Sequence, residues 1–221
     1  MQISEIYEAI QGELPNMGVP MTMVRLQGCP KPYCRWCDTD YALDPKGGRE
    51  YDAPFLEKIL SLSKFICFSG GEPIRQEKEL GILIKRLHRA VIEIETSAFY
   101  PPPKWHGKID YWVVDYKCPF SGRKSISMDK WIDKLRKQDA VKFVVSDDED
   151  MSFAIRNRVK NCKNVVSPTI RENGIVEDNG EVRISSSQLE WIRKVERFCI
   201  ENNFLFSLQQ HRLVWGLKKG V

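Results

Sequence analysis

Short β-branched runs of hydrophobic residues alternate along this chain with segments of helical periodicity. Seven runs, bounded by polar or turn-forming residues, are predicted as strands. They are Thr22–Gln27, Lys64–Ser69, Val91–Thr96, Tyr111–Tyr116, Ala140–Ser146, Asn164–Ser167 and Phe204–Gln209. Between most of them apolar residues recur at helical spacing, as at Leu80, Leu83 and Leu87. This alternation predicts an α/β fold in which crossover helices join parallel strands.

Two further helical patterns complete the outline of the fold. One is carried by Met128, Trp131 and Leu135, and the other by Leu189, Ile192, Val195 and Cys199. We predict that the second of these helices opens with a capping box, Ser187-Gln188-Leu189-Glu190. Six or seven strands are fewer than a complete eight-stranded barrel needs. The pattern alone therefore leaves a partial barrel and an open doubly wound sheet as alternatives.

Polar residues of distinctive chemistry follow the predicted strands at the points where these end. The clusters are Gln27-Gly28-Cys29, Ser69-Gly70-Gly71-Glu72, Glu95-Thr96-Ser97, Asp115-Tyr116-Lys117, Ser146-Asp147, Ser167-Pro168-Thr169 and Gln209-Gln210-His211. Parallel α/β proteins bind their ligands at the carboxyl ends of the strands. We therefore expect these clusters to surround one site.

Composition and charge narrow the class of protein. The 221 residues are 42% hydrophobic, and 34 Lys and Arg against 30 Asp and Glu give a net charge of +4. This length suits a single domain, 1–221. The charge is too small and too dispersed for a nucleic-acid binder, but it suits a small anionic substrate. Neither a run of about 18 apolar residues nor a signal-peptide pattern is present, so we expect a cytoplasmic protein without a membrane partner.

Three of the seven cysteines, Cys29, Cys34 and Cys37, have C-x4-C-x2-C spacing. An odd count with three cysteines in one short loop argues against a disulfide framework. Closely spaced thiolates bind iron–sulfur clusters, zinc or copper(I). Three ligands suggest a 4Fe-4S cluster with one open iron, and the alternative is a zinc site completed by a distant Cys or His. The remaining cysteines are predicted to be core thiols: Cys67, Cys118, Cys162 and Cys199.

A second motif, Ser69-Gly70-Gly71-Glu72-Pro73, follows a predicted strand directly. Paired glycines let the backbone approach a ligand closely, and the glutamate offers a carboxylate for an ammonium group. Alone the motif is ordinary turn chemistry. With the upstream cysteine triplet it becomes specific.

Together the two motifs resemble the radical S-adenosylmethionine superfamily. There, a 4Fe-4S cluster on three cysteines chelates S-adenosylmethionine and cleaves it to a 5′-deoxyadenosyl radical. Within the superfamily, nearly the whole chain is similar to the 7-carboxy-7-deazaguanine synthase family. The matching segments are Ser4–Tyr7, Gln11–Glu13, Arg25, Gly28-Cys29, Cys37–Asp40, Ser69–Pro73, Glu95-Thr96, Asp115–Lys117, Lys142–Val145, Ser167-Pro168 and Gln209–His211. The fold implied is a partial TIM-like barrel of about six parallel strands with a cluster-binding loop at 29–37.

The resemblance also implies a role for each matching residue. Cys29, Cys34 and Cys37 would ligate the cluster, and Thr39 would coordinate Mg²⁺ beside a substrate carboxylate. The substrate residues would be Ile10, Gln11, Gly12, Glu13, Arg25, Ser69 and His211. The S-adenosylmethionine pocket would comprise Trp36, Asp38, Gly70, Gly71, Glu72, Thr96, Asp115, Tyr116, Lys117, Ser146, Ser167, Pro168, Thr169 and Ile170. No side chain is assigned a catalytic role beyond the cofactors.

The implied reaction converts 6-carboxytetrahydropterin to 7-carboxy-7-deazaguanine with loss of ammonia, as an early step toward queuosine or archaeosine. A homodimer and an external electron donor such as flavodoxin or ferredoxin are implied with it, and no nucleic acid is expected as a partner. The cysteine loop departs from the superfamily's C-x3-C-x2-C spacing by one residue. The tail Gly216–Val221 does not match closely and receives no role.

Other interpretations stay open at this point. A glycyl-radical activase shares the cluster motif, although it does not predict Gln11-Gly12-Glu13. A zinc-stabilised RNA- or protein-binding module would explain the cysteines without radical chemistry. For single residues, Glu13 and Arg25 also fit a solvated surface pair. Thr39 fits a turn or helix cap, and His211 fits a core histidine.

Overall fold

The computed structural model describes residues 1–178, 181–216 and 218. One nine-stranded sheet has the order β11-β8-β7-β6-β5-β4-β2-β1-β3. Its parallel strands are β2 (Pro20–Leu26), β4 (Phe65–Gly70), β5 (Val91–Thr96), β6 (Tyr111–Asp115), β7 (Ala140–Val145), β8 (Lys163–Pro168) and β11 (Leu205–Phe206). The antiparallel strands β1 (Gln2–Ile10) and β3 (Arg49–Glu50) extend one edge. The predicted α/β partial barrel is confirmed: its seven parallel strands lie at the seven predicted runs, and the sheet does not close among the described residues.

The last predicted strand is wrong in length. β11 covers only Leu205–Phe206, whereas the prediction ran to Gln209. The Ser207 backbone N–H still donates to the Val166 carbonyl, but the Ser207 hydroxyl accepts from Leu14 N–H. The chain then turns into a short helix, so the polar residues after Ser207 are not part of the sheet.

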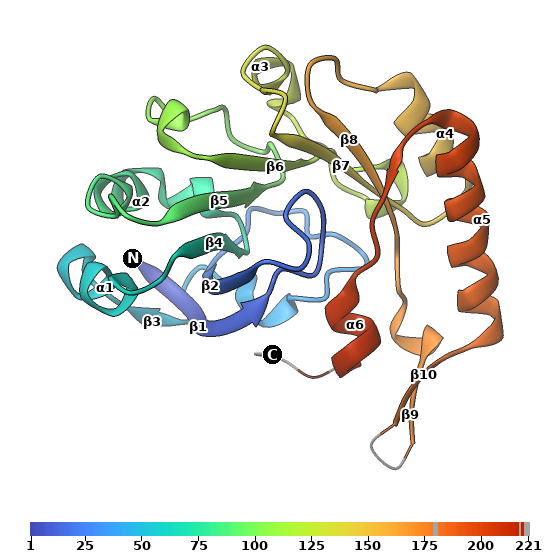
Figure 1. Ribbon diagram of the computed structural model, residues 1–221, viewed down its shortest axis with the longest axis horizontal. Coiled ribbons are helices and arrows are strands. Elements are labelled where there is room, and N and C mark those ends of the chain that lie inside the picture. The colour runs from blue at the N-terminus through green and yellow to red at the C-terminus, as the bar shows by residue number, and fades with distance from the viewer. Residues whose placement is uncertain (179–180, 217, 219–221) are drawn as a thin grey trace.

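Helices cover the sheet on its outer side. They are α1 (Ala53–Leu60), α2 (Glu77–Ile84), α3 (Met128–Ile132), α4 (Asp148–Arg156) and α5 (Ser186–Asn202). The short helix α6 (Gln210–Trp215) instead lies between β1 and a separate hairpin of β9 (Ile175–Asp178) and β10 (Glu181–Ile184), as Figure 1 shows. Short 3-10 helices cover Asp40–Ala42, Pro73–Gln76, His106–Lys108, Pro119–Ser121 and Glu172–Gly174. No helix among the described residues is long and apolar enough to cross a bilayer.

The capping box predicted for α5 is wrong by two residues. Ser185 is the N-cap, and its side chain accepts from the backbone N–H of Gln188 at 3.3 Å. Three consecutive serines, 185 to 187, each suit a cap, and the backbone is already extended at the first of them. The helix therefore begins at Ser186.

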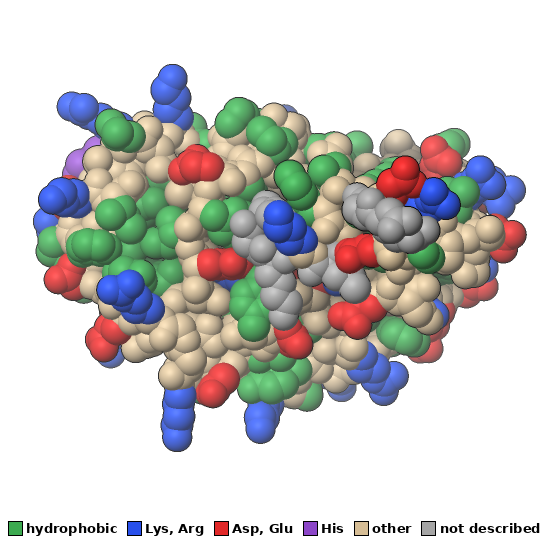
Figure 2. All heavy atoms as spheres, turned by 90° about the horizontal axis from the view of Figure 1, so that it is seen from below, with side chains coloured by type: hydrophobic (Ala, Val, Ile, Leu, Met, Phe, Trp, Pro, Cys, Tyr) green, Lys and Arg blue, Asp and Glu red, His purple; other side chains and the backbone are tan. Residues whose placement is uncertain are grey.

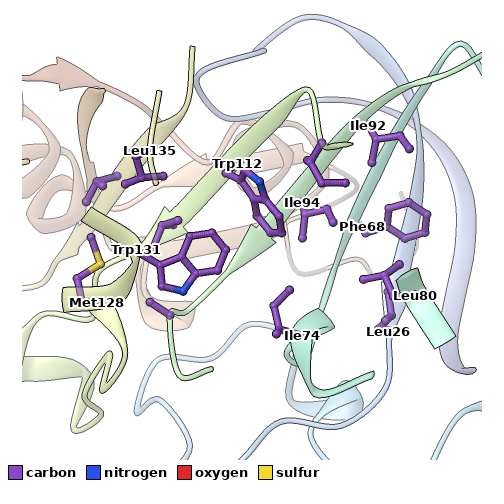
Figure 3. Packing of buried hydrophobic residues seen from close by; sticks show 14 of the residues in the cluster. Leu26, Phe68, Ile74, Leu80, Ile92, Ile94, Trp112, Met128, Trp131 and Leu135 are labelled. Carbon is purple, nitrogen blue, oxygen red and sulfur yellow. The ribbon is translucent and has the colours of Figure 1, made fainter. Parts of the chain in front are cut away.

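The main core lies between the sheet and its outer helices (Figure 3). Trp112 from β6 meets Trp131 from α3 edge to face, with ring centroids 4.8 Å apart, and both are fully buried. Phe68 and Ile94 on the sheet pack in the same cluster as Leu80 of α2. Each large apolar side chain removed from water contributes roughly 1.5–3 kcal/mol, so this layer fixes the outer face of the strands.

The inner face of the sheet changes character along the strands. At its amino end Met21, Met23, Phe65 and Cys67 form a second, small apolar cluster. Because side chains on one face alternate, the next inward position on β2 is Arg25, and on β4 it is Ser69. The apolar cluster closes the floor of the curled sheet, and polar groups line the level above it.

Charged side chains of both signs are interspersed on the face that Figure 2 shows, which includes the side of α6 and the hairpin. The coloured side chains there do not gather into one basic area. This distribution agrees with the small net charge of the sequence.

Candidate functional site

A cavity of about 210 Å³ lies at the carboxyl ends of the strands. Every residue predicted to contact substrate lines it: Ile10, Gln11, Gly12, Glu13, Arg25, Ser69 and His211. So do the three loop cysteines, Thr39, and six of the residues predicted for the cofactor pocket: Trp36, Asp38, Gly70, Gly71, Asp115 and Lys117. The structure therefore brings these groups, which are far apart in sequence, to one place.

The other residues predicted for the cofactor pocket do not line the cavity: Glu72, Thr96, Tyr116, Ser146, Ser167, Pro168, Thr169 and Ile170. Glu72 is fully buried, and its carboxylate accepts from Thr96 Oγ1 at 2.7 Å and from Ser97 N–H at 2.9 Å. In this structure the carboxylate bonds to the scaffold, and the ammonium-binding role predicted for Glu72 stays a prediction. The carboxylate thus joins the glycine turn, Gly70-Gly71, to the end of β5.

Behind the cavity, the remaining predicted residues bond mainly to one another or to the scaffold. Ser146 Oγ and Thr169 Oγ1 lie 2.9 Å apart, and the Tyr116 hydroxyl donates to Asn157 Oδ1. Ser167 Oγ is buried without a hydrogen-bond partner among the described residues. The contact between Ser146 and Thr169 joins the ends of β7 and β8.

The cysteine loop is clamped to the glycine turn through the backbone. Gly28 has φ of +97°, which favours glycine, and its N–H donates to the Ala42 carbonyl. A Cβ on Gly71 would lie 2.4 Å from the Gly28 carbonyl oxygen, so only glycine fits at Gly71. The turn and the start of the loop thereby fix each other directly beside Cys29.

The sequence left a single zinc ion and a 4Fe-4S cluster as alternative occupants of the cysteine loop. All three loop thiols, those of Cys29, Cys34 and Cys37, line the same cavity. A second group of potential ligands, Cys67, Glu93 and Glu95, has three ligand atoms within 4.8 Å of one another.

The thiols of the loop are held in a partly desolvated environment. Burial raises the pKa of the Cys37 thiol to about 11. Burial also raises the pKa of the Cys29 thiol, while the guanidinium of Arg123 opposes that shift. Metal binding would displace these protons, because thiolate is the ligand form. The chemistry of the donor set thus fits the 4Fe-4S cluster implied by the sequence.

The four cysteines outside the loop occupy the scaffold. Cys67, Cys118 and Cys199 are buried, Cys162 is half-buried, and all are free thiols. The prediction of core thiols is confirmed for the three buried ones.

Arg25 lies at the boundary between the cysteine loop and the sheet. Its Nε donates to Glu5 at 2.6 Å, and its other nitrogens donate to the hydroxyls of Tyr7 and Thr39. Glu13 bonds instead to Lys142, 2.7 Å away. The interpretation of Glu13 and Arg25 as one solvated pair is therefore wrong, since Arg25 pairs with Glu5 and Glu13 pairs with Lys142.

Asp38 connects the cysteine loop to α6. Its carboxylate lies 3.6 Å from His211 Nε2 and 3.9 Å from Arg212 Nε. Burial favours the neutral form of Asp38, but His211 and Arg212 outweigh it and hold its pKa well below the usual range. Thr39 precedes a 3-10 helix without capping it, and its hydroxyl donates to Asp38 at 2.9 Å. His211 is partly exposed, so it is not a core histidine.

Two neighbouring carboxylates, Glu93 and Glu95, lie on the inner face of β5. Gln11 Nε2 donates to Glu93 at 2.5 Å and to Glu95 at 3.3 Å, and Ser69 Oγ donates to Glu95 at 2.7 Å. Asn16 also donates to Glu93. Burial first, and then the charge of Glu95, raise the pKa of Glu93 to about 7. This arrangement offers acceptors to a ligand that carries several N–H groups.

A buried ion pair faces the cysteines from β6. Lys117 Nζ donates to Asp115 Oδ2 at 2.6 Å and lies 4.8 Å from the ring centroid of Trp36. Burial lowers the pKa of Lys117, but Asp115 and Cys34 raise it further, so the ammonium stays charged. Asp115 Oδ1 is buried without a hydrogen-bond partner among the described residues.

The predictions did not assign a role to Glu95, Lys142 or Arg123, although all three line the cavity. The sequence contained a signal for Glu95 and for Lys142. Glu95 precedes Thr96 at a strand end, and Lys142 is the one polar residue in an apolar run. Nothing in the local sequence distinguishes Arg123 from other loop arginines.

Comparisons with known proteins agree with this architecture. No family model matches the sequence. A 7-carboxy-7-deazaguanine synthase of Koribacter versatilis is 34% identical over 230 residues, which cover both chains completely. Another, of Leptospira interrogans, is 28% identical and covers 99% of this chain and 97% of the relative. The crystal structure of QueE from Escherichia coli has a TM-score of 0.67 at 19% identity, over 94% of this chain and 92% of that one, and so shows a shared fold.

The curled parallel sheet, with a three-cysteine loop over its carboxyl edge, is the arrangement of a radical S-adenosylmethionine enzyme. The whole-length similarity then identifies the group within that class. This chain belongs to the 7-carboxy-7-deazaguanine synthase family. The family resemblance stated from the sequence is confirmed.

Proposed function

We propose that this chain converts 6-carboxytetrahydropterin to 7-carboxy-7-deazaguanine with loss of ammonia. The observation that carries the proposal is the convergence in one cavity of three kinds of group: the loop cysteines, a buried arginine and a pair of carboxylates. A bound 4Fe-4S cluster with S-adenosylmethionine would supply the radical that starts the reaction by abstracting hydrogen. The residues of the chain would orient the pterin for that step.

The pterin has two ends of different chemistry, and the cavity offers a partner for each. The guanidinium of Arg25 suits the planar carboxylate, because it donates in a fixed fork. Glu95, Gln11 and Glu13 offer acceptors for the ring N–H groups. Ser69 joins these two regions, since it is register partner to Arg25 and donates to Glu95.

Magnesium is part of the same proposal. Thr39 Oγ1 already accepts from Arg25 at 3.3 Å, so the hydroxyl lies where the substrate carboxylate would bind. An oxygen ligand from the protein together with one from the substrate suits a hard cation. A homodimer, an electron donor of the flavodoxin or ferredoxin type, and a cytoplasmic location complete the proposal on the strength of the family resemblance.

The test is an anaerobic assay of the reconstituted enzyme with S-adenosylmethionine, Mg²⁺, a reductant and 6-carboxytetrahydropterin. We expect 7-carboxy-7-deazaguanine by mass spectrometry, and a lower rate when Mg²⁺ is removed with a chelator. Cleavage of S-adenosylmethionine without this product would reject the substrate. A colourless, zinc-loaded protein would reject the cluster, and with it the whole proposal.

A further inference from the structure

Arg123 reaches the cysteine loop from a distant part of the chain. It follows Gly122, whose φ of +70° turns the backbone. The backbone N–H of Arg123 donates to Ser121 Oγ at 3.1 Å. The side chain is 4% exposed. Its Nη1 donates to Cys29 Sγ at 2.8 Å, across 94 residues of sequence, and the guanidinium carbon lies 5.0 Å from the ring centroid of Phe99.

This buried guanidinium has no carboxylate partner among the described residues. Its Nε and Nη2 are buried and form no hydrogen bond within that part of the chain. Glu72 influences the guanidinium through its charge, but its oxygens accept from Thr96 and Ser97. A buried charge is costly unless it is paired. The sulfur of Cys29 is therefore the one atom in hydrogen-bond contact that carries negative charge when it is a thiolate.

The turn that carries Arg123 also contacts the middle of the cysteine loop. The backbone N–H of Arg35 donates to the Ser121 carbonyl at 3.0 Å, and Arg35 lies between Cys34 and Cys37. One rigid turn thus holds the loop at two places, near its first and second cysteines. This attachment limits how far the guanidinium and Cys29 can separate.

We propose that Arg123 is the counter-cation of the iron–sulfur cluster, donating to the Cys29 thiolate and thereby raising the reduction potential of the cluster. The inference rests on the proposed function, because it requires a cluster on Cys29. Net charge and hydrogen bonds to sulfur set the potentials of such clusters. Reduction adds negative charge, so a fixed positive charge and a hydrogen bond stabilise the reduced form more than the oxidised one. Arg123 is in this sense a positioning residue that acts through the thiolate.

The test measures the midpoint potential of the reconstituted cluster by redox titration with EPR detection, in the wild type, R123Q and R123K. Gln removes the charge and the reach to sulfur, and we expect at least a tenfold fall in the ratio of reduced to oxidised cluster at the wild-type midpoint. That ratio corresponds to a shift of about 59 mV downward for one electron. Lys keeps a charge without the planar fork, so its shift is expected to be smaller.

The matched control is R35Q, which removes an exposed arginine from the same loop without touching a cysteine sulfur. Because solvent screens an exposed charge, the potential of the R35Q cluster should shift from the wild-type value by much less than that of R123Q. A cluster-loaded R123Q with the wild-type potential overturns the inference but leaves the proposed function intact, whereas a wild type without a cluster overturns the proposed function. If R123Q does not fold, R123K decides, since a potential equal to that of the wild type overturns the inference and a lower one supports it.

Discussion

On the cysteine side of the cavity a buried guanidinium donates to a sulfur, whereas on the sheet side two carboxylates lie together on β5. Arg123 has no carboxylate partner among the described residues, and the groups that donate hydrogen bonds to Glu93 and Glu95 are uncharged. Arg123 on one side, and Glu93 and Glu95 on the other, therefore form no salt bridge among the described residues. An anionic cluster would balance the first side, and the N–H groups of a pterin would satisfy the second. On the proposed function, binding of these two ligands would complete the electrostatics of the site.

The largest effect should come from breaking the cysteine side alone. C34A removes one of three cluster ligands, so we expect complete loss of iron–sulfur absorbance and of S-adenosylmethionine cleavage after anaerobic reconstitution. C162A, which removes a half-buried thiol outside the cavity, is the control and should keep both signals. A full cluster in C34A would show that Cys34 is not a ligand.

The boundary between the two sides is tested at Arg25. R25Q removes the charged donors proposed for the substrate carboxylate. We expect this to cost about 3 kcal/mol of substrate binding free energy, or roughly 100-fold in affinity. Steady-state kinetics should show this loss as a raised KM for the carboxypterin, while cluster content stays at the wild-type level. An unchanged KM would place the carboxylate elsewhere.

The sheet side should be visible in the pH dependence of stability. The pKa of Glu93 is raised to about 7 in the folded protein. The stabilising contribution of its protonated form is therefore fully present below the pKa of the unfolded chain and is lost as pH rises through 7. Between pH 5 and pH 7 the free energy of unfolding of the wild type should fall by about 2 kcal/mol relative to that of E93Q. Urea unfolding of both proteins at the two pH values measures this difference.

E57Q provides the control for that experiment. Glu57 pairs with Arg86 on the surface, so this variant should keep the pH dependence of the wild type. Parallel curves for the wild type and E93Q would mean that Glu93 titrates at the ordinary value for a glutamate.

The smallest effect is expected at Ser69, where the two sides meet. S69A removes one hydrogen bond to Glu95, worth about 1 kcal/mol, so KM should rise roughly fivefold. Cluster content and its EPR signal should not change. An effect as large as that of R25Q would mean that the hydroxyl contacts the substrate carboxylate itself.

Strand positions could be predicted from sequence because buried parallel strands give continuous apolar runs. β5 agrees with its prediction at both ends, and β4 is displaced by one residue. β1 was missed because Ile3, Ile6, Tyr7 and Ile10 have the spacing of a helix. Antiparallel pairing with β2, from Ile3 opposite Leu26 to Ile10 opposite Pro20, overrides that local pattern.

The residues of the site were predictable where a motif carries them. The cysteines, the paired glycines and Arg25 all lie at the cavity. The place of Glu72 was not predictable, because its partners Thr96 and Ser97 come from the next strand of the sheet. The contact between Arg123 and Cys29 joins residues 94 positions apart, and no local pattern encodes it.

The close contact between Gly71 and Gly28 has a consequence for engineering. The cysteine loop cannot be transplanted onto another parallel sheet as a single segment. Its backbone at Gly28 packs directly against Gly71 in the glycine turn that follows the neighbouring strand. A graft would have to carry both loops, together with the spacing between β2 and β4 that lets Gly71 N–H donate to the Leu26 carbonyl. The smallest portable unit of this site is a pair of adjacent strands with their two loops.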